Sequence, residues 1–237
     1  MNWDWKETDK EKCWFRKVCK HGSDLNYCNN NFCIMNHKMN FLTSSAMLSE
    51  KDKYPVKLIP DADGTDKDKF LILKDIQINI SDFVSSGKNL FIYSKITGNG
   101  KSAWAKKLLL AWFNSIIYFT DYECRGLFIN LPRFFNALKD NISNKSEYIE
   151  YVKQYIDNVD LVVWDEIGVK NLGSWEHDIL LNYINLRVER GKSNIFTSNM
   201  IPEELKEKLG DRLYSRIIQT STLVELTGMD KRGLSLN

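Results

Sequence analysis

The sequence of 237 residues lacks a long apolar run and has no excess of either charge. Residues 1–7 are polar and do not form the apolar core of a signal peptide, and no later stretch has the length that a membrane-spanning helix requires. Lysine and arginine number 33 and aspartate and glutamate 31, so any nucleic-acid site must be local. These absences predict a soluble cytoplasmic protein with no membrane partner.

Proline and cysteine are also scarce, and both are unevenly placed. Two of the four prolines, Pro55 and Pro60, lie just before the polar run 61–66, and together they mark a break between two parts of the chain. With 43% hydrophobic residues, the chain has enough apolar side chains for a proper core. We therefore predict three segments: a cysteine-rich amino-terminal module over 1–55, a linker over 56–69 and a main domain over 70–237.

The main domain contains a glycine-rich segment between an apolar strand and a long helix. Residues 95–102 read Lys-Ile-Thr-Gly-Asn-Gly-Lys-Ser; they follow the apolar residues 90–93 and precede a stretch over 103–113 without glycine or proline. This pattern is typical of a nucleotide phosphate-binding loop, although a turn before a core helix would also fit it. The predicted nucleotide-binding residues are Thr97, Gly98, Asn99, Gly100, Lys101 and Ser102.

The residue types in this loop suit phosphate chemistry. Gly98 and Gly100 allow backbone N–H groups to close around phosphate oxygens, Lys101 can reach the β- and γ-phosphates, and Ser102 can bind Mg²⁺. Lys95 stands where the pattern usually has its first glycine, which normally permits the tight exit from the strand. The loop therefore departs from the pattern at one position.

Short apolar runs alternate with helical stretches along the main domain, which predicts an α/β fold with a parallel sheet. The expected strands are 90–93, 127–129, 161–164, 195–197 and 223–226. The expected helices are a lead-in over 70–84, then 132–142, 146–156, 175–188 and a last helix beginning at Pro202.

Two of these helices have recognisable apolar faces. In the helix over 175–188, we expect the face that carries Trp175, Ile179, Tyr183 and Leu186 to be buried. In the last helix, leucines recur at helical spacing and form one apolar stripe. The members of that stripe are Leu205, Leu209, Leu213 and Ile217.

Polar residues follow two of the expected strands. Asp165 and Glu166 end the strand over 161–164, where Asp165 can hold Mg²⁺ together with Ser102, and Glu166 can polarise the water that attacks a γ-phosphate. Asn199 follows the strand over 195–197 and can orient that water or contact the γ-phosphate, although a turn or helix-capping role is an alternative. These positions predict an ATP or GTP hydrolysis site.

The order of these motifs resembles the AAA+ ATPases of the DnaC/DnaI-type replicative helicase loader family. The phosphate loop is followed by the Asp-Glu strand, then by Thr-Ser-Asn-Met at 197–200 and by Arg-Leu-Tyr-Ser-Arg at 212–216. The resemblance covers roughly residues 65–237, and the segment 92–105 is most like phage-encoded members. It implies a P-loop AAA+ ATPase core, ATP as the nucleotide and a location in the bacterial cytoplasm.

The resemblance also assigns roles to individual residues. It makes Asn199 the sensor of the γ-phosphate and Arg216 the finger that reaches the nucleotide of a neighbouring subunit, which implies a homo-oligomer. It places Arg232 where related ATPases have a second arginine sensor in the same subunit. The implied partners are a replicative DNA helicase and single-stranded DNA, and the implied function is an ATPase, stimulated by assembly and DNA, that loads the helicase during DNA replication.

Four of the five cysteines fall within 21 residues of the amino-terminal module. In a reducing compartment such a cluster favours a metal over disulfides, and four thiolates suit a tetrahedral Zn²⁺ site. The predicted zinc ligands are Cys13, Cys19, Cys28 and Cys33. A Cys₃His set that includes His37 is an alternative, and His21 also remains open as a ligand. Ordinary free or buried cysteines are a further alternative to a metal site.

Two other functions fit the same residues. One is a transposition helper ATPase of the related IstB type, which shares the ATPase motifs but usually lacks a cysteine cluster. The other is a nucleotide-gated adaptor that does not hydrolyse ATP and binds a host protein or RNA through a zinc head. The presence of Glu166, Asn199 and Arg216 argues against the adaptor.

Overall fold

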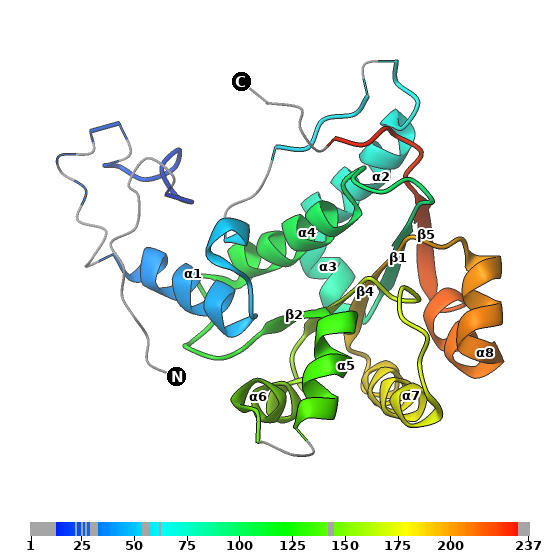
Figure 1. The fold of residues 1–237 in the computed structure, drawn as a ribbon. Helices are drawn as coiled ribbons and strands as arrows, with labels where there is room; N and C mark the ends of the chain where they lie inside the picture. Colours follow the sequence, from blue (N-terminus) through cyan, green and yellow to red (C-terminus); the bar gives the residue numbers. More distant parts are fainter. Residues whose placement is uncertain are drawn as a thin grey trace.

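A five-stranded parallel sheet forms the centre of the protein, as the computed structural model shows in Figure 1. The structure describes residues 13–231 apart from 22, 25, 27, 29–32, 54–56, 62 and 142–144. The strands lie in the order β2-β3-β4-β1-β5, and every neighbouring pair is parallel. The strands are β1 Asn89–Tyr93, β2 Gly126–Asn130, β3 Leu161–Asp165, β4 Ser193–Ser198 and β5 Ser221–Glu225.

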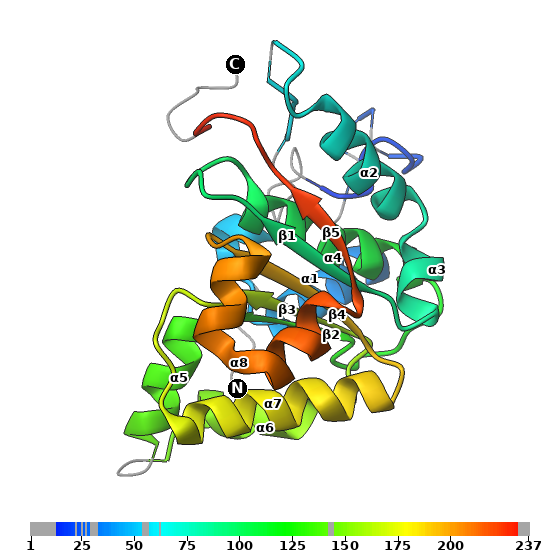
Figure 2. The same cartoon turned by 90° about the vertical axis from the view of Figure 1, so that its right-hand side faces the viewer.

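Helices cover both faces of this sheet and make a three-layer structure (Figures 1 and 2). One face carries α1 Ile34–Ser45, α2 Lys67–Ile78, α3 Ile80–Ser85 and α4 Lys101–Ile116. The other face carries α5 Leu131–Asp140, α6 Glu147–Tyr155, α7 Ser174–Glu189 and α8 Pro202–Ile218. A short 3₁₀ helix, η4 Glu50–Asp52, lies between α1 and α2.

The inner strands β1, β3 and β4 are almost entirely buried because helices cover both faces of the sheet there, whereas the edge strand β5 is partly exposed. Successive side chains in a strand point to opposite faces. In β1, Leu90 and Ile92 pack with the α1–α4 layer, while Phe91 packs with the α5–α8 layer. All five expected strands are present, and their alternation with helices gives the expected α/β fold.

The apolar stripe of the last helix is confirmed. Leu205, Leu209, Leu213 and Ile217 are all buried against the sheet. The helix is bent at Gly210, whose φ of 73° and ψ of 166° are not helical. Glycine adopts a positive φ without the steric penalty of a Cβ atom, so the bend occurs at this residue.

The predicted buried face of α7 is wrong. Trp175 is 46% exposed, and the buried residues of this helix include Leu180 and Ile184 together with the charged Glu176 and Arg187. Charged residues are accepted in the core here because each is matched by partners, with Lys170 Nζ lying 2.9 Å from Glu176 Oε1. A pattern based on hydrophobicity alone assigns these residues to the surface.

The helix α1 packs directly on the main domain. It lies beside α4 and β2, and Met39 and Leu42 belong to the same apolar cluster as the α4 side chains. Just after α1, Ala46 accepts a hydrogen bond from the backbone N–H of Phe128 in β2, with an N–O distance of 2.9 Å.

The predicted boundary between residues 55 and 56 lies outside the described residues, and the division into domains stays a prediction. Among the described helices, none has the length and apolar character needed to cross a bilayer.

Candidate nucleotide-binding site

The carboxyl edge of the sheet holds a cavity of about 440 Å³. The loop after β1 and the ends of β3 and β4 meet there, because parallel strands bring their carboxyl ends to one edge. The lining residues come from three motifs that are far apart in the sequence. They are Thr97, Gly98, Gly100, Lys101, Ser102, Ala103, Glu166, Thr197, Ser198 and Asn199.

The glycines of the phosphate loop have backbone conformations that favour glycine. Gly98 has a φ of 76° and Gly100 a φ of 104°, both in the left-handed region. Gly100 directly precedes α4, so the first N–H groups of that helix face the cavity, where they lack intrahelical partners. The loop and the helix start therefore provide N–H donors suited to phosphate oxygens.

The Lys101 ammonium is held close to the loop. Its Nζ donates to the Ile96 carbonyl oxygen at 2.8 Å and lies 3.2 Å from the Asn99 Oδ1. Both acceptors are neutral, and a phosphate oxygen is a stronger acceptor for an ammonium because it is charged. Lys101 therefore lies where it can exchange a neutral acceptor for a phosphate.

Thr197 contacts both acidic residues at the end of β3. Its hydroxyl donates to Asp165 Oδ1 at 2.8 Å and accepts a hydrogen bond from the Glu166 backbone N–H at 3.0 Å. Glu166 has a φ of 64°, which is uncommon for a residue with a side chain. This turn ends the strand and brings Glu166 to the cavity, while Asp165 stays buried beside Thr197. The two adjacent carboxylates thus have different surroundings, as their different predicted roles require.

Asn130 is a site residue that the sequence analysis missed. Its Nδ2 donates to Glu166 Oε2 at 2.9 Å and lies 3.4 Å from Asp165 Oδ2. Asn130 ends β2 and is opposite Asp165 in the register of β2 with β3. The sequence shows only that Asn130 is a polar residue directly after the apolar residues 127–129. That β2 pairs with β3, and so brings Asn130 next to Asp165, is known only from the tertiary structure.

The segment after β5 supports the phosphate loop from behind. The Lys231 backbone N–H donates to the Gly98 carbonyl oxygen at 3.0 Å, and the Leu226 carbonyl oxygen accepts from Asn99 Nδ2 at 2.8 Å. In a trans peptide the C=O and N–H groups point in opposite directions. Fixing the Gly98 carbonyl therefore directs the Asn99 N–H to the opposite side of the loop.

Ion pairs anchor this carboxyl-terminal segment to the residues before α2. Lys231 Nζ lies 2.9 Å from Asp66 Oδ2 and 3.1 Å from Asp61 Oδ1, and 4.4 Å from the centre of the Phe70 ring. Figure 1 shows the two segments side by side above β5. Arg232, the expected second sensor, lies outside the described residues.

The other predicted ATPase residues have distinct positions. Asn199 lines the cavity together with Glu166. Arg216 is exposed on α8 and is not among the residues that line the cavity. Lys95, which replaces the usual glycine, forms an ion pair of 2.7 Å with Glu204 at the start of α8. Lys95 is thus accommodated because its side chain points away from the loop to a charged partner.

Magnesium fits the residues at this edge. Mg²⁺ usually takes one or two protein oxygens together with water and the phosphates of a nucleotide. Ser102 lines the cavity, and Asp165 ends β3 directly before the lining residue Glu166, so both residues carry oxygen atoms of the type that Mg²⁺ prefers. A bound Mg²⁺ would neutralise part of the charge on the phosphates of a nucleotide.

The cysteine cluster gives weaker support for zinc. Burial raises the pKa of the Cys13 thiol, and the nearby thiols of Cys33, Cys28 and Cys19 raise it further. In the part of the chain that the structure describes, however, no three Cys, His, Asp or Glu side chains are arranged to hold a metal ion. The predicted zinc site is therefore not supported by this arrangement.

Comparison with known proteins agrees with the order of the motifs. No protein-family model matches the chain. The replicative helicase loader DnaC of Escherichia coli (strain K12) is 29% identical over 142 residues, which are 59% of this chain and 51% of DnaC. The chain is similar in sequence to replicative helicase loaders of the DnaC type. It spans about half the length of the curated relatives that it matches, and this similarity confirms the predicted resemblance without addressing a phage origin.

Solved structures confirm the fold. The crystal structure of the DnaC helicase loader has a TM-score of 0.56 and 21% identity, covering 71% of this chain and 93% of that one. The replication initiator DnaA bound to AMPPCP and single-stranded DNA has a TM-score of 0.54 and 19% identity, covering 68% of this chain and 46% of that one. The predicted α/β fold with a parallel sheet is therefore confirmed.

Proposed function

We propose that this protein is an ATP-dependent loader that binds a replicative DNA helicase and delivers it to single-stranded DNA during DNA replication. The observation that carries the proposal is the meeting of the phosphate loop, Glu166 and Asn199 at one cavity, with Asp165 directly before Glu166 at the end of β3. The sequence similarity to DnaC supports the helicase as the partner. The DnaA complex with AMPPCP and single-stranded DNA supports ATP and DNA as ligands of this fold.

In the proposed reaction, the loop N–H groups and Lys101 bind the β- and γ-phosphates, and Ser102 and Asp165 hold Mg²⁺. Glu166 accepts a proton from the water that attacks the γ-phosphorus, and Asn199 orients that water or the γ-phosphate. The bond between the γ-phosphorus and the bridging oxygen breaks, and ADP leaves with that electron pair. Asn130 holds one oxygen of Glu166, so this amide competes with the water for the carboxylate.

Arg216 completes the proposed site of a neighbouring subunit. Its exposure on α8, outside the cavity of its own subunit, supports a role across an interface in a homo-oligomer. An arginine supplied in trans contributes on the order of 10³–10⁵ to the rate. Arg216→Ala should therefore keep ATP affinity but lower assembly-stimulated turnover about 10³-fold.

A matched control is available for this test. Arg212 is an exposed arginine one helical turn earlier on α8, and Arg212→Ala should leave stimulated turnover nearly unchanged. Stimulated turnover that is the same for Arg216→Ala and the unmodified protein would remove the finger assignment.

A zinc-bound amino-terminal module is a second element of the proposal. Its support is the spacing of Cys13, Cys19, Cys28 and Cys33 in the sequence. Zinc binding would supply the folding energy that a small module lacks. Metal analysis of protein purified without added chelator should give one zinc per chain, with loss of zinc in Cys28→Ser. A zinc content near zero would leave four free cysteines.

The decisive experiment measures ATP turnover with and without single-stranded DNA and a replicative helicase, together with co-elution of the helicase. Glu166→Gln should bind ATP normally and hydrolyse it about 10²–10⁴ times more slowly, because the amide cannot accept the proton. Helicase co-elution with Glu166-dependent turnover supports the loader. Turnover without helicase binding would favour the IstB-type transposition helper, and ATP binding without turnover would favour a nucleotide-gated adaptor.

A further inference from the structure

A second cavity lies between α2 and α4, away from the nucleotide site. It has a volume of about 600 Å³ and shares no lining residue with the nucleotide cavity. The helices α2 and α4 lie side by side in Figure 1. Lys57, which precedes α2, also lines the cavity. We call this cavity the lysine cleft, and its polar and aromatic lining residues are Trp14, Lys57, Lys74, Gln77, Lys107, Asn114 and Ser115.

Three lysines line this cleft, and none of its lining residues is acidic. Within the described residues, Lys57, Lys74 and Lys107 form no ion pair, whereas the adjacent Lys106 pairs with Asp52 at 2.8 Å. Burial lowers the pKa of Lys107, and the charge of Lys74 lowers it further. Positive charges that crowd together without a counter-ion favour an anionic ligand.

Two other lining residues, Trp14 and Gln77, indicate which class of anionic ligand the cleft could bind. Trp14 offers an indole ring at the cleft, partly buried against the core, and an aromatic ring of this kind can stack on a nucleobase. Gln77 Oε1 is buried without a hydrogen-bond partner in the described part of the chain, so it can accept from a base N–H. A nucleic acid has phosphates, flat bases and N–H donors, whereas an acidic peptide lacks the bases.

We propose that the lysine cleft binds single-stranded DNA, with the lysines contacting the phosphodiester backbone and Trp14 stacking on a base. The inference rests on the proposed function for its choice of DNA as the ligand, but it does not depend on ATP hydrolysis. A single strand fits better than a duplex because stacking on Trp14 requires an unpaired base. The cleft would also connect two parts of the chain, since Trp14 belongs to the amino-terminal module and Lys107 to α4.

The test measures binding of a fluorescent oligo(dT) to the full-length protein by anisotropy over a range of salt concentrations. Lys74→Gln/Lys107→Gln should weaken binding at least tenfold and reduce the salt slope by about 1.4, because two phosphate contacts are lost. Trp14→Ala should weaken binding about tenfold, and Trp14→Phe should restore most of the affinity. Lys67→Gln/Lys88→Gln, which removes the same charge from exposed positions outside the cleft, should bind nearly as the unmodified protein does.

Each outcome separates this inference from the proposed function. Equal DNA affinity of Lys74→Gln/Lys107→Gln and Lys67→Gln/Lys88→Gln would overturn the proposal that the lysine cleft binds DNA. It would leave the proposed loader function unaffected. No DNA binding by the unmodified protein, with or without ATP, would overturn both the cleft and the DNA part of the proposed function. Competition by poly-glutamate as effective as that by unlabelled oligo(dT) would show a general anion site and overturn the assignment to DNA.

Discussion

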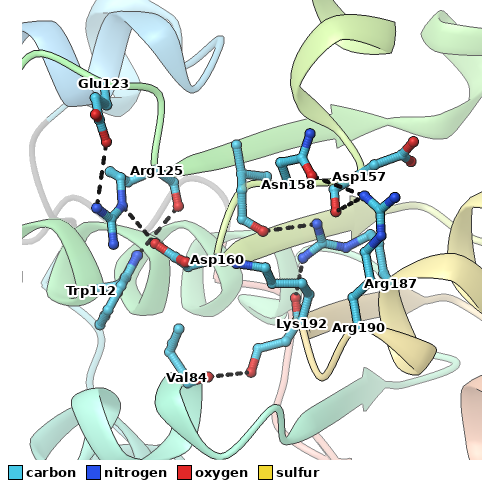
Figure 3. Close-up of polar contacts among 12 residues, drawn as sticks. Val84, Trp112, Glu123, Arg125, Asp157, Asn158, Asp160, Arg187, Arg190 and Lys192 are labelled. Atoms are coloured by element: carbon cyan, nitrogen blue, oxygen red, sulfur yellow. Dashed lines mark hydrogen bonds and ion pairs between the residues drawn. The ribbon is translucent and has the colours of Figure 1, made fainter.

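The two ends of the central sheet both carry charged and polar groups, but they use them differently. At the carboxyl edge, Lys101 and Glu166 face a cavity that can receive a ligand. At the amino edge, which Figure 3 draws in part, Arg187 has no exposed surface, and its guanidinium donates to four oxygens of the protein. Polar groups whose hydrogen-bond partners all lie in the protein stabilise the fold, whereas polar groups that face a cavity can bind or act on a ligand.

The amino edge is a network of matched partners. Arg187 donates to the carbonyl oxygens of Ile156, Val159 and Ser193 at 2.6, 2.9 and 2.7 Å, and to Asn194 Oδ1 at 2.8 Å. Burial lowers the pKa of Arg187 to about 9, so the guanidinium is still charged at neutral pH. Nearby, Asp160 lies 2.6 Å from Arg125 Nε and 3.1 Å from Lys192 Nζ. This network joins the starts of β2, β3 and β4 to the end of α7.

The largest expected effect comes from breaking this network. Arg187→Leu leaves three buried carbonyl oxygens without donors, so the free energy of unfolding should fall by roughly 3–5 kcal/mol. Urea denaturation measures the change. Nucleotide affinity of the folded protein should stay the same, because the lost contacts lie at the other end of the sheet.

The control for this prediction is Arg190→Ala. Arg190 is exposed one turn further along and donates to Asn158 Oδ1 at 2.9 Å. Its removal should change stability by about 0.5 kcal/mol or less. Equal free energies of unfolding for Arg187→Leu and Arg190→Ala would show that the buried contacts of Arg187 do not stabilise the fold.

A smaller effect is expected at the carboxyl edge from Lys231→Met. The change removes the ion pairs with Asp61 and Asp66 and leaves two carboxylates close together, which should loosen the segment that holds the Gly98 carbonyl. The affinity for a fluorescent ATP analogue should fall about tenfold, equivalent to roughly 1.4 kcal/mol. Lys231→Arg should retain most of the affinity, and equal loss in both variants would mean that the charge at this position is unimportant.

The smallest effect is expected from Asn130→Ala. It frees one Glu166 oxygen to bind the attacking water, so basal ATP turnover should rise severalfold while ATP affinity is unchanged. Steady-state turnover measures this effect. Asn136→Ala on α5 is the matched control, because Asn136 contacts Lys170 rather than Glu166. Lower turnover in Asn130→Ala would show instead that Asn130 holds Glu166 in its productive orientation.

The sequence predicted the elements well because their signals are local. Apolar runs bounded by polar residues gave the strands, and leucines at helical spacing gave the buried face of α8. The prediction failed for α7, where the buried face contains Glu176 and Arg187. Their partners lie on other elements, so no pattern within the helix can identify them as core residues.

The same distinction applies to the candidate site. The phosphate loop residues, Glu166 and Asn199 were predicted from their motifs, and they line one cavity. Asn130, Thr197 and Lys231 were not, because each acts through a contact with a residue at least 31 positions away. Such contacts depend on which strands are neighbours and on where the segment after β5 runs.

The sequence by itself determined the α/β fold and the residue types of a nucleotide site, since local spacing sets both. The tertiary structure alone decided which polar groups are matched and which face a cavity. Satisfying a buried charge takes several oxygens in fixed positions, and only the packed sheet and helices bring them together. Arg187 and Lys107 are both cations on helices in the sequence, yet one is enclosed by carbonyl oxygens and the other faces an open cleft.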